Sequence, residues 1–258
     1  MFEEVLQGQS TELPDKLVVY GIPKTGKTRF AAEFPDPFFI DIEGGLKYLP
    51  KKVRATPKLN SYDEAIGWLK HIHNDDKFTC GTLIIDSLDW LEELAQARLI
   101  KIHNASSITD TKVPAFAFFK GVTDAAGDAI TAIKWIDAIF KKKGIRTILI
   151  AHSEVKNIDL PNQEPFTRYQ LKTSKMLSAK ANEWADLILF ADWEHHVTSE
   201  GKAAGKKKAI LRAGGDASFI GGGRMFLPET IPLSYDALVK STGLLIKIEP
   251  ETTNTNTK

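Results

Sequence analysis

The chain has 258 residues, and a composition of 43% hydrophobic and 26% charged residues excludes a disordered, collagen-like or coiled-coil protein. Its 34 lysines and arginines stand against 33 aspartates and glutamates, a net charge of +1 that excludes a globally basic nucleic-acid binder but allows a local basic patch. No apolar run is long enough to span a membrane, and the single Cys80 fits a reducing compartment, so we expect a cytoplasmic protein.

The first half of the sequence alternates apolar runs with helical stretches. The predicted strands, rich in Val, Ile, Leu and Phe, are residues 16–20, 37–41, 82–86 and 145–151. The predicted helices are residues 61–73, 88–103 and 125–140. The apolar runs are nearly continuous, which is typical of strands covered on both faces. The pattern indicates an α/β fold with a mostly parallel central sheet and helices on both faces.

The second half is less regular. Residues 152–168 are polar and interrupted by prolines, so we expect a long loop there. The elements predicted after it are a helix at 174–184, a strand at 186–192, a β-hairpin extension with a basic tip at 199–205, a flexible Gly221-Gly222-Gly223 segment, and a short helix at 234–241 closed by Gly243. We expect an N-terminal extension at 1–15, one domain at 16–249 and a disordered tail at 250–258.

The strongest motif lies directly after the first predicted strand. It fits the phosphate-loop pattern G-x-x-x-x-G-K-[ST] and consists of Gly21, Ile22, Pro23, Lys24, Thr25, Gly26, Lys27 and Thr28. Backbone N–H groups of such a loop and the start of the following helix converge on a phosphate. Lys27 would reach the β and γ phosphates of ATP, and the Thr28 hydroxyl would bind Mg²⁺. The alternative is a plain glycine turn between strand and helix.

Carboxylates follow two other predicted strands. Asp86 ends the run at 82–86 and would hold Mg²⁺ through water; the alternative is an N-cap of the next helix. Glu43 lies just beyond the run at 37–41 and would orient and deprotonate the attacking water. Asp41 alternates with Glu43 and would serve structure. The alternative for this pair is solvated charge at a turn.

A histidine ends the fourth predicted strand. His152 could sense the γ phosphate by a hydrogen bond and pass that signal to the loop that follows. The alternative is a structural histidine.

Two basic segments are candidates for nucleic-acid binding. In the first, aromatic and basic residues interleave, which suits base stacking and contact with a single-strand backbone; its candidates are Arg168, Tyr169, Lys172 and Lys175. The second is a cluster made of Lys202, Lys206, Lys207, Lys208 and Arg212. The alternatives are a solvated amphipathic segment and a soluble hairpin tip, respectively.

With the phosphate loop, Phe-Ile-Asp-Ile-Glu-Gly-Gly, Leu-Ile-Ile-Asp-Ser and Ile-Leu-Ile-Ala-His in this order, residues 16–192 resemble RecA-like recombination ATPases. More narrowly, they resemble bacteriophage RecA-core proteins of the Sak type, which are also described as phage AAA-family ATPases. The resemblance implies a RecA-like P-loop fold, Glu43 as the catalytic glutamate, His152 as the phosphate sensor, and single-stranded DNA on the loop after His152.

The same resemblance implies what the protein does and with which partners. It implies ATP-dependent annealing or strand exchange in the bacterial host cytoplasm, commonly alongside a single-strand-binding protein. It also implies a homo-oligomeric ring or filament in which a neighbour supplies a basic residue, for which Arg212 and Arg224 are candidates.

Two other functions remain open on the sequence alone. One is a P-loop kinase for a small molecule, although the lid arginines of such kinases have no counterpart between Arg98 and Arg146. The other is a non-enzymatic adaptor that recruits replication proteins when a nucleotide binds.

Overall fold

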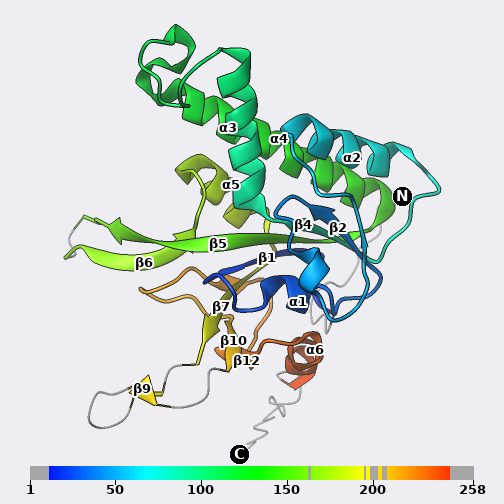
Figure 1. Ribbon diagram of the computed structural model, residues 1–258. Helices are drawn as coiled ribbons and strands as arrows, with labels where there is room; N and C mark the ends of the chain where they lie inside the picture. Colours follow the sequence, from blue (N-terminus) through cyan, green and yellow to red (C-terminus); the bar gives the residue numbers. More distant parts are fainter. Residues whose placement is uncertain (1–11, 162–163, 195, 198–202, 205–207, 245–258) are drawn as a thin grey trace, which may run out of the picture.

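The computed structural model describes residues 12–161, 164–194, 196–197, 203–204 and 208–244 (Figure 1). Its strands are β1 (Lys16–Gly21), β2 (Pro37–Asp41), β3 (Arg54–Ala55), β4 (Thr82–Asp86), β5 (Arg146–Ile158), β6 (Phe166–Leu171), β7 (Leu187–Trp193), β8 (His196–Val197), β9 (Ala203–Ala204), β10 (Ala209–Arg212), β11 (Gly222–Gly223) and β12 (Thr230–Pro232). Its helices are α1 (Lys27–Ala31), α2 (Tyr62–Asn74), α3 (Leu88–Ile102), α4 (Lys120–Lys143), α5 (Lys175–Trp184) and α6 (Tyr235–Leu244), with 3₁₀ helices η1 (Leu46–Tyr48) and η2 (Pro114–Phe119).

The described strands form one large mixed sheet. Its order is β12-β10-β7-β1-β5-β4-β2-β3, with β11 beside β7 and β6 beside β5, while β8 and β9 form a separate ribbon. The strands β7, β1, β5, β4, β2 and β3 run parallel. This confirms the predicted α/β fold with a mostly parallel sheet. The carboxyl ends of the parallel strands therefore share one edge, where Gly21 pairs with His152, and Asp41 pairs with Asp86.

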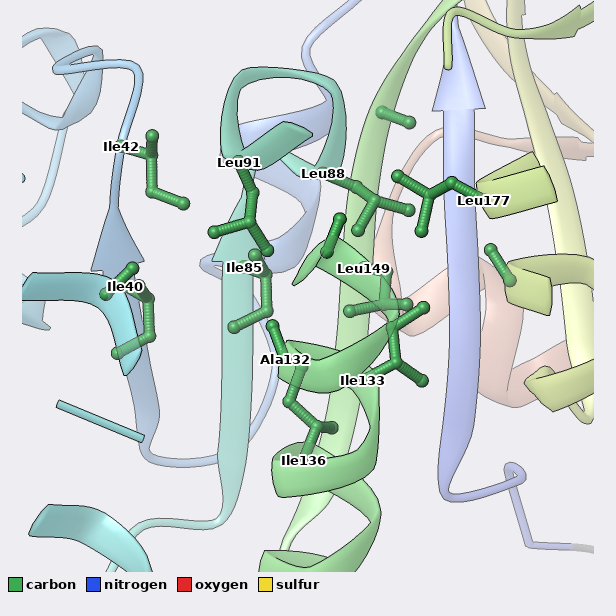
Figure 2. Packing of buried hydrophobic residues seen from close by; sticks show 14 of the residues in the cluster. Ile40, Ile42, Ile85, Leu88, Leu91, Ala132, Ile133, Ile136, Leu149 and Leu177 are labelled. Atoms are coloured by element: carbon green, nitrogen blue, oxygen red, sulfur yellow. The ribbon is translucent and has the colours of Figure 1, made fainter. Parts of the chain in front are cut away.

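Each face of the sheet carries its own hydrophobic core. In Figure 2, Ile85 of β4 and Leu149 of β5 point toward Leu91 of α3 and Ile133 of α4. The neighbouring Ile84 belongs to the second core, beneath α1. Successive strand residues face opposite sides, so only strands with continuous apolar runs can supply both cores. Helices accordingly cover both faces (Figure 1).

The helices predicted at 61–73, 88–103, 125–140 and 174–184 are present as α2, α3, α4 and α5. The Ser61 hydroxyl accepts a hydrogen bond from the Glu64 N–H and caps α2, while the Glu64 carboxylate accepts from the Asn60 N–H. Helix α4 ends where Gly144 adopts a φ of 66°, a left-handed conformation that favours glycine. Helix α6 passes through Gly243 to Leu244, so the predicted stop at Gly243 is wrong.

The long loop predicted over residues 152–168 is also wrong. Strand β5 continues to Ile158 and returns as β6, forming an antiparallel hairpin in which Lys156 pairs with Arg168. A ribbon that extends beyond the helices is exposed to solvent, so its strands need few apolar residues and their composition resembles a loop. The prediction therefore mistook a polar strand for an irregular segment.

The glycine segment at 221–223 is more ordered than the sequence predicts. Gly222 and Gly223 pair with β7, which corrects the predicted flexible segment. The predicted hairpin is present as β7 paired with β10. Lys202 in its predicted tip, Lys206 and Lys207 directly after the tip, and the predicted tail at 250–258 lie outside the described residues.

Leu13 and Pro14, just before β1, contact the rest of the domain. Leu13 lies in the second core, and the carbonyls of Leu13 and Pro14 accept hydrogen bonds from Arg146. None of the helices in the described ranges combines the length and apolar character that crossing a bilayer requires.

Candidate nucleotide site

The phosphate loop connects β1 to α1, as predicted. A Cβ on Gly21 would lie 2.0 Å from the Ala191 carbonyl oxygen, so the close approach of β7 excludes a side chain there. Gly26 has a φ of 103°, which L side chains rarely adopt. Both glycines are thus required by the backbone path of the loop.

Lys27 is folded into its own loop. Its ammonium donates to the carbonyl oxygens of Gly21 at 2.9 Å and Ile22 at 3.0 Å. Burial lowers the pKa of Lys27 to about 8, although Asp86, Asp89 and Glu43 nearby act in the opposite direction. This cation is therefore already surrounded by carbonyl dipoles and carboxylates, at the position where the motif places phosphate.

Asp86 and Thr28 form the next part of the site. The Thr28 hydroxyl donates to Asp86 Oδ2 at 2.8 Å, while Asp86 Oδ1 is buried with no hydrogen-bond partner among the described residues. Burial raises the pKa of Asp86 to about 7, and the nearby carboxylates of Glu43 and Asp41 add to this effect.

A buried carboxylate oxygen without a partner, beside a threonine hydroxyl, suits a hydrated Mg²⁺. The described residues hold no cluster of three His, Cys, Asp or Glu side chains that could bind a metal alone. The pair thus fits Mg²⁺ that takes its remaining ligands from water and phosphate.

Glu43 and Asp41 follow β2 but differ in environment. The Glu43 backbone N–H donates to the Asp86 carbonyl at 3.0 Å, and its side chain is 35% exposed. Asp41 is buried, and its Oδ1 accepts from the Gly44 N–H at 2.7 Å, closing the turn. Burial raises the pKa of Asp41. Glu43 can therefore meet water, while Asp41 holds the turn that places Glu43.

His152 lies between Glu43 and a carboxylate that the sequence analysis missed. His152 Nε2 is 4.0 Å from Glu43 Oε1, and Nδ1 is 2.9 Å from Asp89 Oδ2. Asp89 Oδ1 accepts from the His152 backbone N–H at 3.0 Å and from the Ser87 hydroxyl at 2.8 Å. An acid in the first turn of a helix is ordinarily explained by the helix dipole, which concealed Asp89.

The two candidate arginines pair with carboxylates that do not belong to this cluster. Arg212 Nε donates to Asp192 at 3.1 Å, and its guanidinium lies 5.6 Å from the Phe219 ring centroid. Arg224 pairs with Asp186 at 3.3 Å, just before β7 begins, at the opposite end of the sheet from the phosphate loop. Neither arginine is shown to contact the nucleotide site of its own chain.

The DNA-binding candidates lie on and just after β6, and they differ in their surroundings. The Tyr169 ring stacks on Phe190 with centroids 5.1 Å apart and packs against the core, so the predicted base-stacking role does not fit it. A predicted loop has no core-facing side, so the sequence did not predict that this ring packs inward from β6. Arg168 lies over the Phe166 ring, and Lys172 and Lys175 are exposed beyond β6.

The comparisons with known proteins agree with this geometry. The family model described as AAA domain matches residues 13–225, from the core residue Leu13 through the phosphate loop to the end of the β7–β11 region. No curated protein matches the chain. The chain therefore belongs to the AAA domain family of nucleotide-binding P-loop ATPases.

Proposed function

We propose that the chain is an Mg²⁺-dependent ATPase that acts on single-stranded DNA, in annealing or strand exchange during phage recombination or replication. The ATPase part rests on one observation. The phosphate loop, Asp86 and Glu43 come from three separate segments, yet they adjoin at one edge of the sheet, where Thr28 binds Asp86 and the Glu43 backbone binds the Asp86 carbonyl.

Each residue has a distinct task in hydrolysis. Lys27 would exchange its two carbonyl partners for β and γ phosphate oxygens. Thr28 and Asp86 would hold Mg²⁺, which neutralises phosphate charge when bound. Glu43, with its partly exposed carboxylate, would orient the attacking water and accept its proton.

The DNA part rests on the hairpin of β5 and β6. The pairing of β5 with β6 begins at Ser153, directly after His152. The Lys172 backbone N–H donates a hydrogen bond to the His152 carbonyl at 2.8 Å. Lys172 and Lys175, both exposed, and Arg168 would contact the phosphates of a single strand. DNA bound to Lys172 would therefore contact a residue whose backbone is hydrogen-bonded to His152, the residue that faces Glu43.

Bases would stack elsewhere than on Tyr169. Phe118 and Phe119 at the end of η2 are 101% and 71% exposed as residues, and they have left-handed backbone φ values of 54° and 61°. Exposed rings held in an uncommon backbone conformation suit sequence-independent stacking on a single strand. Figure 1 shows this segment at the far end of α3.

The experiment is to measure ATP turnover with Mg²⁺, alone and with a single-stranded or a double-stranded oligonucleotide of equal length. We expect single-stranded DNA to raise the rate more than the duplex does. Acceptor-dependent phosphate transfer would favour the kinase alternative. Tight ATP binding without turnover under every condition would favour the adaptor and contradict the proposal.

The partners follow from the same proposal. A homo-oligomeric ring or filament would let Arg224 serve a neighbour, since its 78% exposed side chain lies far from its own phosphate loop. A single-strand-binding protein would be a further partner on the DNA.

An interface arginine can be tested by mixing subunits. Chains with Arg224→Ala and chains with Glu43→Gln would each be slow, and mixing them would restore part of the turnover at shared interfaces. The same test with Arg212→Ala separates the two arginines. Turnover proportional to protein concentration into the nanomolar range, with no rescue, would show that each site is complete in one chain.

A further inference from the structure

Asp89 is a buried carboxylate that neither the phosphate loop nor the magnesium pair uses. It lies in the first turn of α3 and is 2% exposed. Both of its oxygens are engaged by His152, and one of them also by Ser87. An ionised carboxylate accepts three hydrogen bonds here, two of them from a single residue on strand β5.

The bonds of Asp89 are not those of an ordinary helix start. Ser87 occupies the N-cap position of α3, yet within the described residues its hydroxyl makes no capping bond. It donates instead to Asp89 Oδ1 at 2.8 Å. A serine that could stabilise the helix end instead fixes the orientation of the carboxylate.

These contacts determine which ring nitrogen of His152 carries the proton next to Asp89. A carboxylate can only accept, so Nδ1 must donate to Oδ2. The hydrogen bond from the His152 backbone N–H to Oδ1 holds the carboxylate at a second point. If the ring turned over, the buried Oδ2 would lose its hydrogen bond, which disfavours that orientation. Burial raises the pKa of Asp89, but the hydrogen bonds that it accepts from His152 and Ser87 outweigh this effect, so the pKa is lowered and the carboxylate stays ionised.

We propose that Asp89 is the positioning residue of the ATPase reaction: it fixes His152 with the proton on Nδ1 and leaves Nε2, beside Glu43, as an acceptor for the attacking water. This proposal rests on the proposed ATP hydrolysis. Nε2 is the nitrogen 4.0 Å from Glu43 Oε1, so the three side chains form one line from the water-activating carboxylate to the start of α3. Helix α3 begins at Leu88, two residues after Asp86. The contact between Asp89 and His152 therefore also connects the end of β4, which carries Asp86, to β5, which carries His152.

The decisive variant is Asp89→Asn. The asparagine oxygen can still accept from Ser87 and the His152 backbone, but its NH₂ group then faces Nδ1 and moves the ring proton to Nε2. We expect kcat to fall by about 10-fold or more, while KM and the affinity for ADP stay within about 2-fold, because a misplaced tautomer impairs the reaction and not binding. The matched control is Asp76→Asn, which removes an acid from the surface, where its side chain is 83% exposed.

A spectroscopic measurement separates positioning from mere folding. In protein labelled with ¹⁵N-histidine, the His152 ring signals are identified by their loss in His152→Gln. We expect protonated Nδ1 in the wild type and protonated Nε2 in Asp89→Asn. If Asp89→Asn does not fold, Ser87→Ala keeps the charge, removes one hydrogen bond and should lower kcat alone.

The outcomes distinguish this assignment from the proposed function. Unprotonated Nδ1 in the wild type, or wild-type kcat in Asp89→Asn, overturns the role of Asp89 while ATP hydrolysis stands. If the wild-type chain does not hydrolyse ATP, the proposed function fails, and the ring signals alone decide whether Asp89 fixes His152.

Discussion

The sheet edge that carries the nucleotide site and the hairpin of β5 and β6 both include strand β5, but they differ in how their charged side chains are exposed to water. At the nucleotide edge, charged groups are buried and hold one another, as in the 2.8 Å contact of Thr28 with Asp86. On the hairpin, Lys172 is exposed, and Glu93 lies 3.6 Å from its ammonium. Charges removed from water interact strongly and keep fixed positions, whereas exposed charges are screened and adaptable. The first arrangement suits chemistry on one atom, and the second suits a polymer of variable sequence.

The largest expected effect is the loss of the phosphate-loop cation. Lys27→Ala should abolish productive nucleotide binding, because it removes the ammonium that would meet the β and γ phosphates. Binding of a fluorescent ADP analogue, with the exposed Lys51→Ala as control, measures this. Wild-type turnover in Lys27→Ala would contradict the nucleotide site itself.

Glu43→Gln should separate binding from hydrolysis at the same edge. The amide keeps the shape of the side chain but cannot accept the proton of water, so we expect turnover to slow by about 10²-fold at unchanged ATP affinity. Glu183→Gln, on the exposed side of α5, is the control. If hydrolysis persists, another carboxylate, such as Asp41, is the base.

The burial of Asp86 predicts a pH-dependent stability in metal-free protein. Folding raises its pKa from 3.8 to about 7, so between these values the folded state keeps a proton that the unfolded chain has lost. The free energy of unfolding should therefore fall as pH rises from about 4 to about 7 because of this group.

Asp86→Asn removes that titration and keeps an acceptor for Thr28. At about 1.4 kcal/mol per pKa unit, the variant should be more stable than wild type by roughly 2–4 kcal/mol at pH 8, and the gain should vanish near pH 4. Urea unfolding in EDTA at both pH values measures it. An equal difference at the two pH values would show that Asp86 is not the group responsible. With Mg²⁺ and ATP, the same variant should lose the stabilisation that the nucleotide gives the wild type.

These two regions also differ in what the sequence could reveal. The phosphate loop is contiguous, and its backbone performs the binding, so the order of residues predicts the site. Asp86 and Glu43 were predictable because buried parallel strands deliver their ends to one edge. Asp89 was not, because its role depends on a contact with His152, 63 positions along the chain. The hairpin was missed because its exposed strands lack an apolar signature.

The basic residues of the hairpin carry a smaller expected effect. Arg168→Ala combined with Lys172→Ala should weaken single-stranded DNA binding and flatten its salt dependence by roughly 0.7 in log–log slope for each phosphate that is no longer neutralised. Fluorescence anisotropy over a range of salt concentrations measures both. Lys70→Ala with Lys77→Ala, on and beyond α2, is the control for the reduced positive charge. Unchanged affinity and slope would place the DNA on another basic segment, first of all the cluster of Lys202, Lys206, Lys207, Lys208 and Arg212.

The smallest expected effect on DNA is that of Tyr169, and it sharpens the contrast between the two faces of the hairpin. The Tyr169 ring already stacks on Phe190 at an interplanar angle of 29°, and Phe190 stacks in turn on Phe219, so the ring holds β6 to the core. Tyr169→Ala should cost about 2 kcal/mol of stability and lower Tm by about 4–8 °C, since it removes an aromatic pair and half-buried area. Tyr169→Phe keeps the ring and should change neither. At a temperature where Tyr169→Ala is folded, its DNA affinity should stay within about 2-fold of wild type, whereas Phe118→Ala should lose affinity through stacking. A loss of DNA affinity in Tyr169→Ala without a loss of stability would contradict this assignment. It would mean that the Tyr169 ring leaves Phe190 and stacks on a base.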